Sequence, residues 1–213
     1  MKAIIIGAGD YGAVYRSYLL EDTRFDVVGF LDDDCRLVGT TVSGLEVLGT
    51  TELLLELRSQ GVEAVFAPIG NNKVRIGLLE RARAAGLSTP NFIHRSVQYT
   101  ADCVFGEGVY ILANCSIMPF AHIDDFTMIS VGSNVAHHST LGRGVFLAAG
   151  VNVGANVVIR EGAFCGYGAT VITGVKDVGE YAVVGAGSVV IRDVAPGVTV
   201  AGVPAKVLHK GQR

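Results

Sequence analysis

The 213-residue chain carries a formal net charge of −3, half of its residues are hydrophobic, and it contains 28 glycines and no tryptophan. The acidic balance gives no basic footprint for nucleic acid or an anionic membrane, and no apolar run reaches the length of a membrane span. The apolar start is too short for a signal peptide, so we expect a cytoplasmic protein without a nucleic-acid or membrane partner.

The first 95 residues alternate strands with helices. The expected buried strands are residues 2–7, 26–31 and 63–67, and the expected helices are residues 11–21, 51–60 and 73–85. This alternation predicts a small parallel α/β unit. We place its boundary near residue 95, where the pattern changes.

A glycine motif, GxGxxG, follows the first strand from Gly7 to Gly12, and Asp32 ends the next strand 20 residues later. Taken alone, this spacing predicts a dinucleotide site. The unit spans only about 90 residues, half of a full dinucleotide fold, so a mononucleotide-linked ligand fits better. A tight turn without a ligand is the alternative. Gly70 ends the third strand at the same edge, where Asn72 could equally be an ordinary helix cap.

From Phe105 onward the chain repeats with a period of six. Every sixth residue as far as Val171 is apolar, and the residue four places further is small or β-branched. After one extra residue near Asp177, the pattern resumes at Val178. This period fits neither a helix nor a plain strand, and it predicts a solenoid of very short strands with the aliphatic position in the core.

Glycines and cysteines occupy defined places in this repeat. Six glycines directly follow the aliphatic position, where we expect demanding backbone dihedrals: Gly106, Gly142, Gly154, Gly166, Gly179 and Gly185. Three of the four cysteines, Cys103, Cys115 and Cys165, fall on inward positions. They show no zinc spacing, so we expect buried thiols.

His137 and His138 are third and fourth in their repeat, which places them at a corner of the solenoid. The residues 18 positions before and after His137, Pro119 and Ala155, are uncharged. A corner histidine can serve as a general base near pH 7. Two solvated histidines without function are one alternative. A zinc site is another, but His122 is 15 and not 18 residues away and does not stack in register, so we expect no metal.

The repeat, together with residues 184–190 (VGAGSVV) and 201–206 (AGVPAK), resembles the hexapeptide-repeat acyltransferases. With the glycine motif in front, nearly the whole chain is similar to one branch of that family: the sialic acid O-acetyltransferase-like proteins and the nucleotide-amino-sugar N-acetyltransferases of bacterial glycan synthesis. The resemblance implies an α/β Rossmann-like half-domain (1–95), an all-β left-handed parallel β-helix (96–208) and a tail (209–213). It also implies a homotrimer with acetyl-CoA as cosubstrate.

The same resemblance assigns roles to residues. Within residues 135–142 (VAHHSTLG), His137 matches the general base, and His138 stands where the family has an acid. Phe146 replaces a second family histidine. Residues that match the sugar-nucleotide pocket are Gly9, Asp10, Tyr11, Asp32, Asp33 and Gly70. Those that match the acetyl-CoA site between subunits are Phe146, Tyr167, Gly185 and Ala186.

We therefore expect an acetyl-CoA-dependent N-acetyltransferase that acts on a nucleotide-linked 4-amino-4,6-dideoxy sugar for a bacterial surface glycan. O-acetylation of a sugar such as sialic acid is an alternative, but it needs a stronger base, and the missing acid at His138 argues against it. The missing acid and Phe146 also leave open a non-catalytic trimer that binds a sugar nucleotide.

Overall fold

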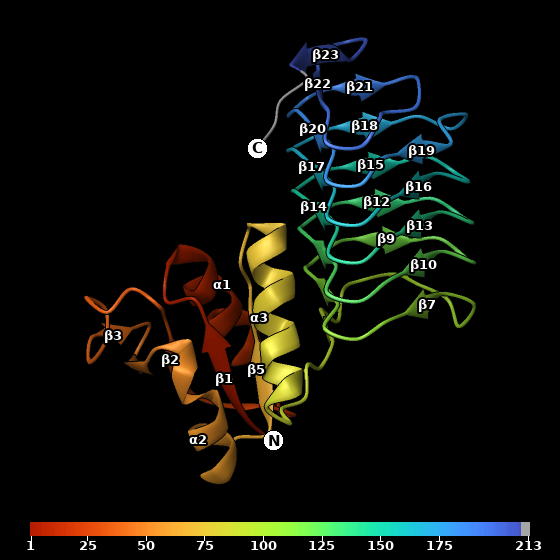
Figure 1. The fold of residues 1–213 in the computed structure, drawn as a ribbon. Coiled ribbons are helices and arrows are strands. Elements are labelled where there is room, and N and C mark those ends of the chain that lie inside the picture. The colour runs from red at the N-terminus through yellow and green to blue at the C-terminus, as the bar shows by residue number, and fades with distance from the viewer. Residues whose placement is uncertain (210–213) are drawn as a thin grey trace. The chain divides into compact units, whose positions relative to one another are not determined.

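The computed structural model describes residues 1–209 and divides the chain into two compact units, residues 1–90 and 91–213 (Figure 1). The predicted boundary near residue 95 lies just inside the second unit. Residues 210–213 of the predicted tail lie outside the described residues. Within residues 1–209, no helix is long and apolar enough to cross a membrane.

The first unit is a five-stranded sheet with helices packed against it. Its strands are β1 (Lys2–Ile6), β2 (Asp26–Leu31), β3 (Thr41–Val42), β4 (Leu45–Gly49) and β5 (Ala64–Phe66), in the order β3-β4-β2-β1-β5. Its helices are α1 (Asp10–Leu19), the 3-10 turn η1 (Thr51–Leu53), α2 (Leu54–Ser59) and α3 (Asn72–Ala84). The strands β4, β2, β1 and β5 run parallel, as the alternation predicts, whereas the antiparallel pair β3–β4 was not predicted.

The second unit is a parallel β-helix whose coils present three sheets. The first sheet contains β7 (Val104–Phe105), β10 (His122–Ile123), β13 (Thr140–Leu141), β16 (Val158–Ile159) and β19 (Asp177–Val178). The second sheet contains β6 (Phe92–Ile93), β8 (Tyr110–Ile111), β11 (Met128–Ile129), β14 (Phe146–Leu147), β17 (Phe164–Cys165), β20 (Val183–Val184), β22 (Thr199–Ala201) and β23 (Lys206–His209). The third sheet contains β9 (Ser116–Ile117), β12 (Asn134–Val135), β15 (Asn152–Val153), β18 (Thr170–Val171) and β21 (Val189–Val190).

The register of these sheets confirms the six-residue period. Thr140 pairs with Val158, 18 positions further, so three repeats make one coil. Val158 then pairs with Asp177, 19 positions further, which confirms the one extra residue near Asp177.

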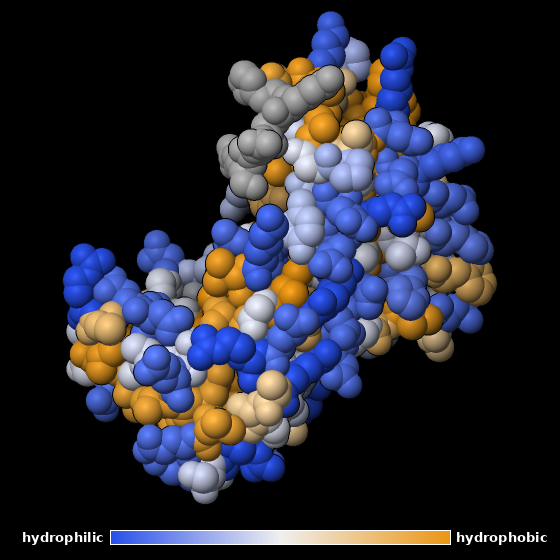
Figure 2. Space-filling model, viewed as in Figure 1, coloured by the Kyte–Doolittle hydropathy of each residue, from blue (hydrophilic) through white to orange (hydrophobic). Residues whose placement is uncertain are grey.

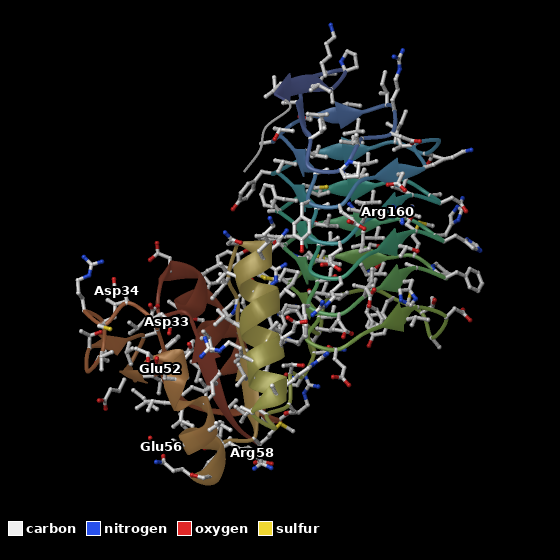
Figure 3. The ribbon with its side chains drawn as sticks, viewed as in Figure 1. Asp33, Asp34, Glu52, Glu56, Arg58 and Arg160 are labelled. Carbon is white, nitrogen blue, oxygen red and sulfur yellow. The ribbon has the colours of Figure 1, made fainter. Side chains whose placement is uncertain are left out.

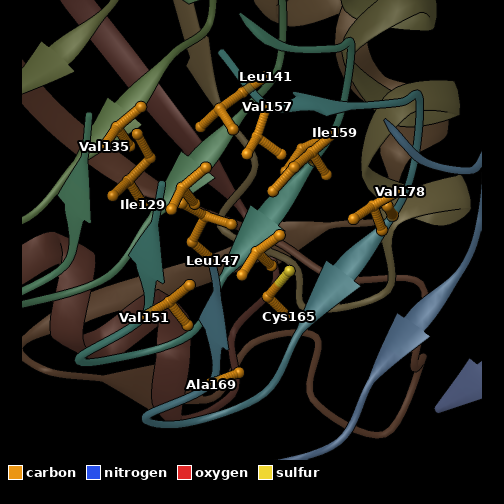
Figure 4. Close-up of a cluster of buried hydrophobic side chains, with 14 of the residues drawn as sticks. Ile129, Val135, Leu141, Leu147, Val151, Val157, Ile159, Cys165, Ala169 and Val178 are labelled. Atoms are coloured by element: carbon orange, nitrogen blue, oxygen red, sulfur yellow. The ribbon is translucent and has the colours of Figure 1, made fainter. Parts of the chain in front are cut away.

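The aliphatic positions form one continuous core along the β-helix (Figure 4). Cys115 and Cys165 belong to it as buried thiols, as predicted, whereas Cys103 is only partly buried. Burial raises the pKa of the Cys165 thiol to about 12. The face seen in Figure 2 is mostly hydrophilic over the β-helix and shows more apolar surface over the first unit.

The glycines after the aliphatic positions have a different role from the predicted one. None of the six has a left-handed φ. Instead, a Cβ at Gly154 would lie 2.3 Å from the backbone nitrogen of Thr173 in the next coil, and a Cβ at Gly179 would lie 2.4 Å from that of Pro196. The coils therefore approach so closely here that no side chain fits.

Left-handed residues stand instead at the corners, stacked from coil to coil. One column consists of Asn114, Gly132, Gly150, Gly168 and Gly187. A second consists of Gly108, Phe126, Gly144, Gly162, Tyr181 and Gly197. The third, which contains a predicted site residue, consists of Phe120, His138, Asn156 and Gly174.

Candidate active site

In the first unit, the glycine loop after β1 is held by a carboxylate at the end of β2. Asp32 Oδ2 accepts a hydrogen bond from the Ala8 backbone N–H at 2.8 Å, and Oδ1 accepts one from the Asp34 N–H at 2.9 Å. A Cβ at Gly12 would lie 1.9 Å from the Gly7 carbonyl oxygen, so α1 can pack against the loop only with glycine there. Asp32 therefore fixes the shape of the glycine loop.

Asp33 makes a second connection, which sequence analysis did not find. Its Oδ1 accepts hydrogen bonds from the Thr51 backbone N–H at 2.9 Å and from Thr51 Oγ1 at 2.8 Å. Arg81 Nη1 donates to the same hydroxyl at 3.1 Å. Asp33 and Asp34 lie at the end of β2 (Figure 3). The hydrogen bonds between Asp33 and Thr51 therefore tie the end of β2 to the start of η1.

The other predicted residues of the sugar-nucleotide pocket lie at the same edge of the sheet. Gly9 precedes α1, and a Cβ there would meet no atom within 4 Å. Asp10 is exposed in the first turn of α1, and Tyr11 is half-buried. The loop that carries Gly70 is adjacent, since the Ile69 side chain lies 3.4 Å from the Cβ position of Gly7.

The cap of α3 is Asn71 and not Asn72. The Asn71 side chain accepts a hydrogen bond from the Val74 N–H at 3.2 Å, and Asn72 is the first residue of the helix. Asn71 has the extended backbone that a capping residue requires, which the sequence alone could not place to the residue.

In the second unit, His137 and His138 form a hydrogen-bonded pair at the corner between β12 and β13. Their Nδ1 atoms are 3.0 Å apart, and the rings meet edge to face with centroids 5.2 Å apart. His137 is half-buried and His138 is exposed. One of the two Nδ1 atoms must donate this hydrogen bond and the other must accept it, and the tautomers of the rings decide which one donates.

An aromatic residue one coil earlier packs against this pair. The Phe120 and His138 rings are 4.8 Å apart, and the His138 N–H donates to the Pro119 carbonyl at 3.3 Å. Phe120 and His138 have φ of 64° and 59°. A left-handed conformation costs about 1–2 kcal/mol for an L-residue, and histidine tolerates it better than a bulky side chain such as phenylalanine.

The predicted acetyl-CoA residues lie elsewhere on the coil. Tyr167, which is 64 % exposed, stands at the corner between β17 and β18, and Gly185 and Ala186 stand at the same corner one coil later. Phe146 is buried on β14, where its ring packs against Phe164 at 5.4 Å. Within one chain, His137 and Tyr167 therefore occupy different corners.

A groove of about 400 Å³ follows the third sheet, which connects these two corners. Its outer residues are uncharged, and they include Ser116, Met118, Asn134, Asn152, Thr170 and Ile172. Met118 and Ile172 are exposed, and Asn134 Nδ2 donates to Asn152 Oδ1 at 2.9 Å. Among the described residues, no group of three His, Cys, Asp or Glu side chains could hold a metal ion.

Known proteins resemble this chain in both of its units. Residues 2–82 match the family described as the PglD N-terminal domain. The chain is 36 % identical to PerB from Caulobacter crescentus, solved with CoA and GDP-perosamine, over 98 % of both chains with a TM-score of 0.84. It is 28 % identical to the acetyltransferase domain of PglB from Neisseria gonorrhoeae, over 97 % of this chain and 99 % of that one, with a TM-score of 0.80.

A curated relative, GDP-perosamine N-acetyltransferase of Escherichia coli O157:H7, is 29 % identical over 97 % of this chain and 96 % of its own length. Two further structures of the Caulobacter crescentus perosamine enzyme carry one histidine replaced by asparagine or by alanine, each with CoA and GDP-perosamine. These similarities confirm the predicted fold, an α/β half-domain followed by a left-handed parallel β-helix.

Proposed function

The chain belongs to the hexapeptide-repeat acetyltransferases, and from that premise we propose that it transfers the acetyl group of acetyl-CoA to the amine of a nucleotide-linked 4-amino-4,6-dideoxy sugar. The observation that carries this proposal is the histidine pair at a coil corner of a fold whose relative binds both CoA and GDP-perosamine. We also propose that the enzyme works in the cytoplasm.

The first unit would hold the nucleotide. The loop before α1 offers backbone N–H groups and the positive end of the helix dipole, which favour a phosphate. Gly9 has open space at its Cβ position, so a ligand can approach the backbone, and Asp32 keeps the loop in shape. Because the sheet is half of a dinucleotide fold, we expect a sugar nucleotide and not NAD. Calorimetry that finds tight NAD(H) binding and no sugar-nucleotide binding would reverse this assignment.

His137 would supply the general base. The cosubstrate brings the acetyl group as a thioester, which the amine nitrogen attacks at the carbonyl carbon. His137 Nε2 takes one proton from that nitrogen as the N–C bond forms. The C–S bond breaks with its electron pair on sulfur, and His137 Nε2 returns the proton to the thiolate, so the products are an amide and free CoA.

We place the complete site between subunits of a homotrimer. His137 and the predicted cofactor residue Tyr167 occupy different corners of one coil, so a neighbouring chain can bring the two together. The face between these corners lacks charge and exposes Met118 and Ile172, a composition that suits the centre of an interface. Light scattering should give a trimer, and Ile172→Asp should dissociate it. A monomeric parent protein at micromolar concentration would contradict the assembly.

The decisive assay measures thiol release from acetyl-CoA with GDP-, UDP- and dTDP-linked 4-amino sugars. Each amine is compared with the sugar nucleotide that carries a hydroxyl at the same carbon. Turnover with one amine and none with its hydroxyl counterpart supports the proposal. Faster turnover with the hydroxyl would establish O-acetylation instead, and inactivity on the whole panel would return the non-catalytic alternative.

A further inference from the structure

The hydrogen bond between the two histidines decides which nitrogen of His137 can act as a base. With Nδ1 atoms 3.0 Å apart, one ring must donate and the other must accept. If His138 donates, the proton of neutral His137 sits on Nε2, and that nitrogen cannot take another. If His137 donates from Nδ1, its Nε2 lone pair is open, and His138 carries its own proton on Nε2.

We propose that His138 is a positioning residue that holds His137 in the Nδ1-protonated tautomer, and that the Phe120 ring keeps His138 in the orientation that does so. This inference rests on the proposed function, in which His137 Nε2 receives the amine proton. His138 would then act through His137 and not on the substrate itself.

The backbone around His138 supports this role. His138 has a φ of 59°, its side chain reaches back to His137, and its N–H donates to the Pro119 carbonyl in the coil before. Phe120 occupies the equivalent position 18 residues earlier, with φ of 64°. In the column that begins with Asn114, glycine fills all of the later positions.

Neither burial nor conformational ease explains phenylalanine at position 120. The side chain is 55 % exposed, and its backbone adopts a region that disfavours bulky residues. Its ring nevertheless packs 4.8 Å from the His138 ring. A strained residue beside a catalytic group indicates that the strain serves the site.

His138 also supplies part of the stabilisation that a carboxylate would give to protonated His137. When His137 takes the amine proton at Nε2, its Nδ1–H becomes a charged donor to neutral His138, and such hydrogen bonds are shorter and stronger than neutral ones. His138 thus stabilises the protonated base without a negative charge of its own. The proton returns from Nε2 to the thiolate, so the tautomer is restored after each turnover.

The test compares His138→Gly with His138→Asn in the full chain. Glycine and asparagine both accept a left-handed backbone, but only asparagine keeps a side-chain acceptor for the His137 N–H. We expect His138→Gly to lower kcat about 10- to 100-fold, the worth of a hydrogen bond to a charged group, with KM changed less than about threefold. His138→Asn should recover most of kcat. Equal losses in both variants, or no loss in either, would overturn the proposal.

Phe120→Gly tests the second part, with Asn114→Gly as the matched control. Asn114 is also left-handed, with φ of 61°, but stands at another corner. Both changes should leave thermal stability equal or higher, because glycine has no strain there. Only Phe120→Gly should lower kcat, by about threefold or more. An unchanged kcat for Phe120→Gly would remove Phe120 from the mechanism.

Nitrogen-15 NMR of histidine-labelled protein reads the tautomer without any substrate. The parent protein should show His137 protonated at Nδ1 and unprotonated at Nε2 near neutral pH, and His138→Gly should show a mixture of tautomers. A His137 protonated at Nε2 in the parent protein would refute the inference. If the tautomer is as expected but no amino sugar is acetylated, the proposed function fails and the histidine pair stands.

Discussion

Replacing His137 by alanine isolates the chemistry of the corner from its structure. The side chain is half-buried at a turn and is not part of the aliphatic core. Its backbone carbonyl accepts the Asn156 N–H at 3.2 Å, and this inter-coil bond survives truncation of the side chain. The free energy of unfolding should therefore stay within about 0.5 kcal/mol of the parent value, as for other changes away from the core.

The loss of the proposed base should appear in kcat. General-base catalysis contributes about 10²- to 10⁴-fold, which corresponds to about 2.7–5.4 kcal/mol of barrier. Thiol release at saturating acetyl-CoA and amino sugar measures kcat, and calorimetry should find CoA binding nearly unchanged. The control is His122→Ala, which removes an exposed histidine on β10. Turnover of His137→Ala within threefold of the parent would show that another group is the base.

Four further predictions concern stability, thiol reactivity and binding. Gly154→Ala should destabilise the protein by at least about 2 kcal/mol, because its Cβ would lie 2.3 Å from the backbone of the next coil. Gly132→Ala has open space around its Cβ and should cost only about 1 kcal/mol of backbone strain. Urea titration of the two variants measures this difference in the free energy of unfolding. The exposed Cys35 should react with a thiol reagent in the native protein and Cys165 should not. Because burial raises the pKa of Cys165 from 9.0 to about 12, the free energy of unfolding should fall as pH rises through this window, where only the unfolded thiol ionises. Asp32→Ala leaves two backbone N–H groups without their acceptor, so it should weaken sugar-nucleotide binding in calorimetry and cost about 1–3 kcal/mol of stability.

The solenoid could be predicted from sequence because its core follows one simple rule. Aliphatic positions such as Ile129, Val135 and Leu141 are fully buried, and the six-residue spacing records that burial directly. The extra residue near Asp177 was also visible, since it shifts every later inward position by one place. When buried positions recur at a fixed spacing, the sequence shows the pattern directly, and no knowledge of distant contacts is needed to recognise it.

Contacts between separate elements could not be recognised in the sequence in this way. Asp33 and Thr51 are 18 residues apart in a part of the chain without a repeat, and only the parallel order of β2 and β4 brings them together. The glycines after the aliphatic positions were recognised, but their reason was wrong. Sequence reasoning credited them with unusual dihedrals, whereas the approach of the next coil excludes a Cβ, a distance that depends on stacking.

The left-handed aromatic residues show the limit most clearly. Local preference would put glycine or asparagine at such corners, yet Phe120, Phe126 and Tyr181 adopt φ of 64°, 61° and 53°. Phe126 and Tyr181 follow the left-handed residues Gly108 and Gly162 of the preceding coil, whereas Phe120 is the first left-handed residue of its column. No local pattern predicts which corner of the β-helix accepts a bulky residue.

Two unexpected features, the residue type at position 138 and the backbone conformation of Phe120, occur at the same corner, and each helps to explain the other. His138 stands where the family resemblance implies an acid, and Phe120 adopts a conformation that its side chain disfavours, while their rings lie 4.8 Å apart. An amine is already nucleophilic while it holds its protons and loses one as the N–C bond forms, whereas a hydroxyl needs a stronger base to become nucleophilic, so a neutral histidine pair suits the first acceptor better than the second. The missing acid is then a reason to expect an amino sugar as the acceptor, and not a sign of lost activity.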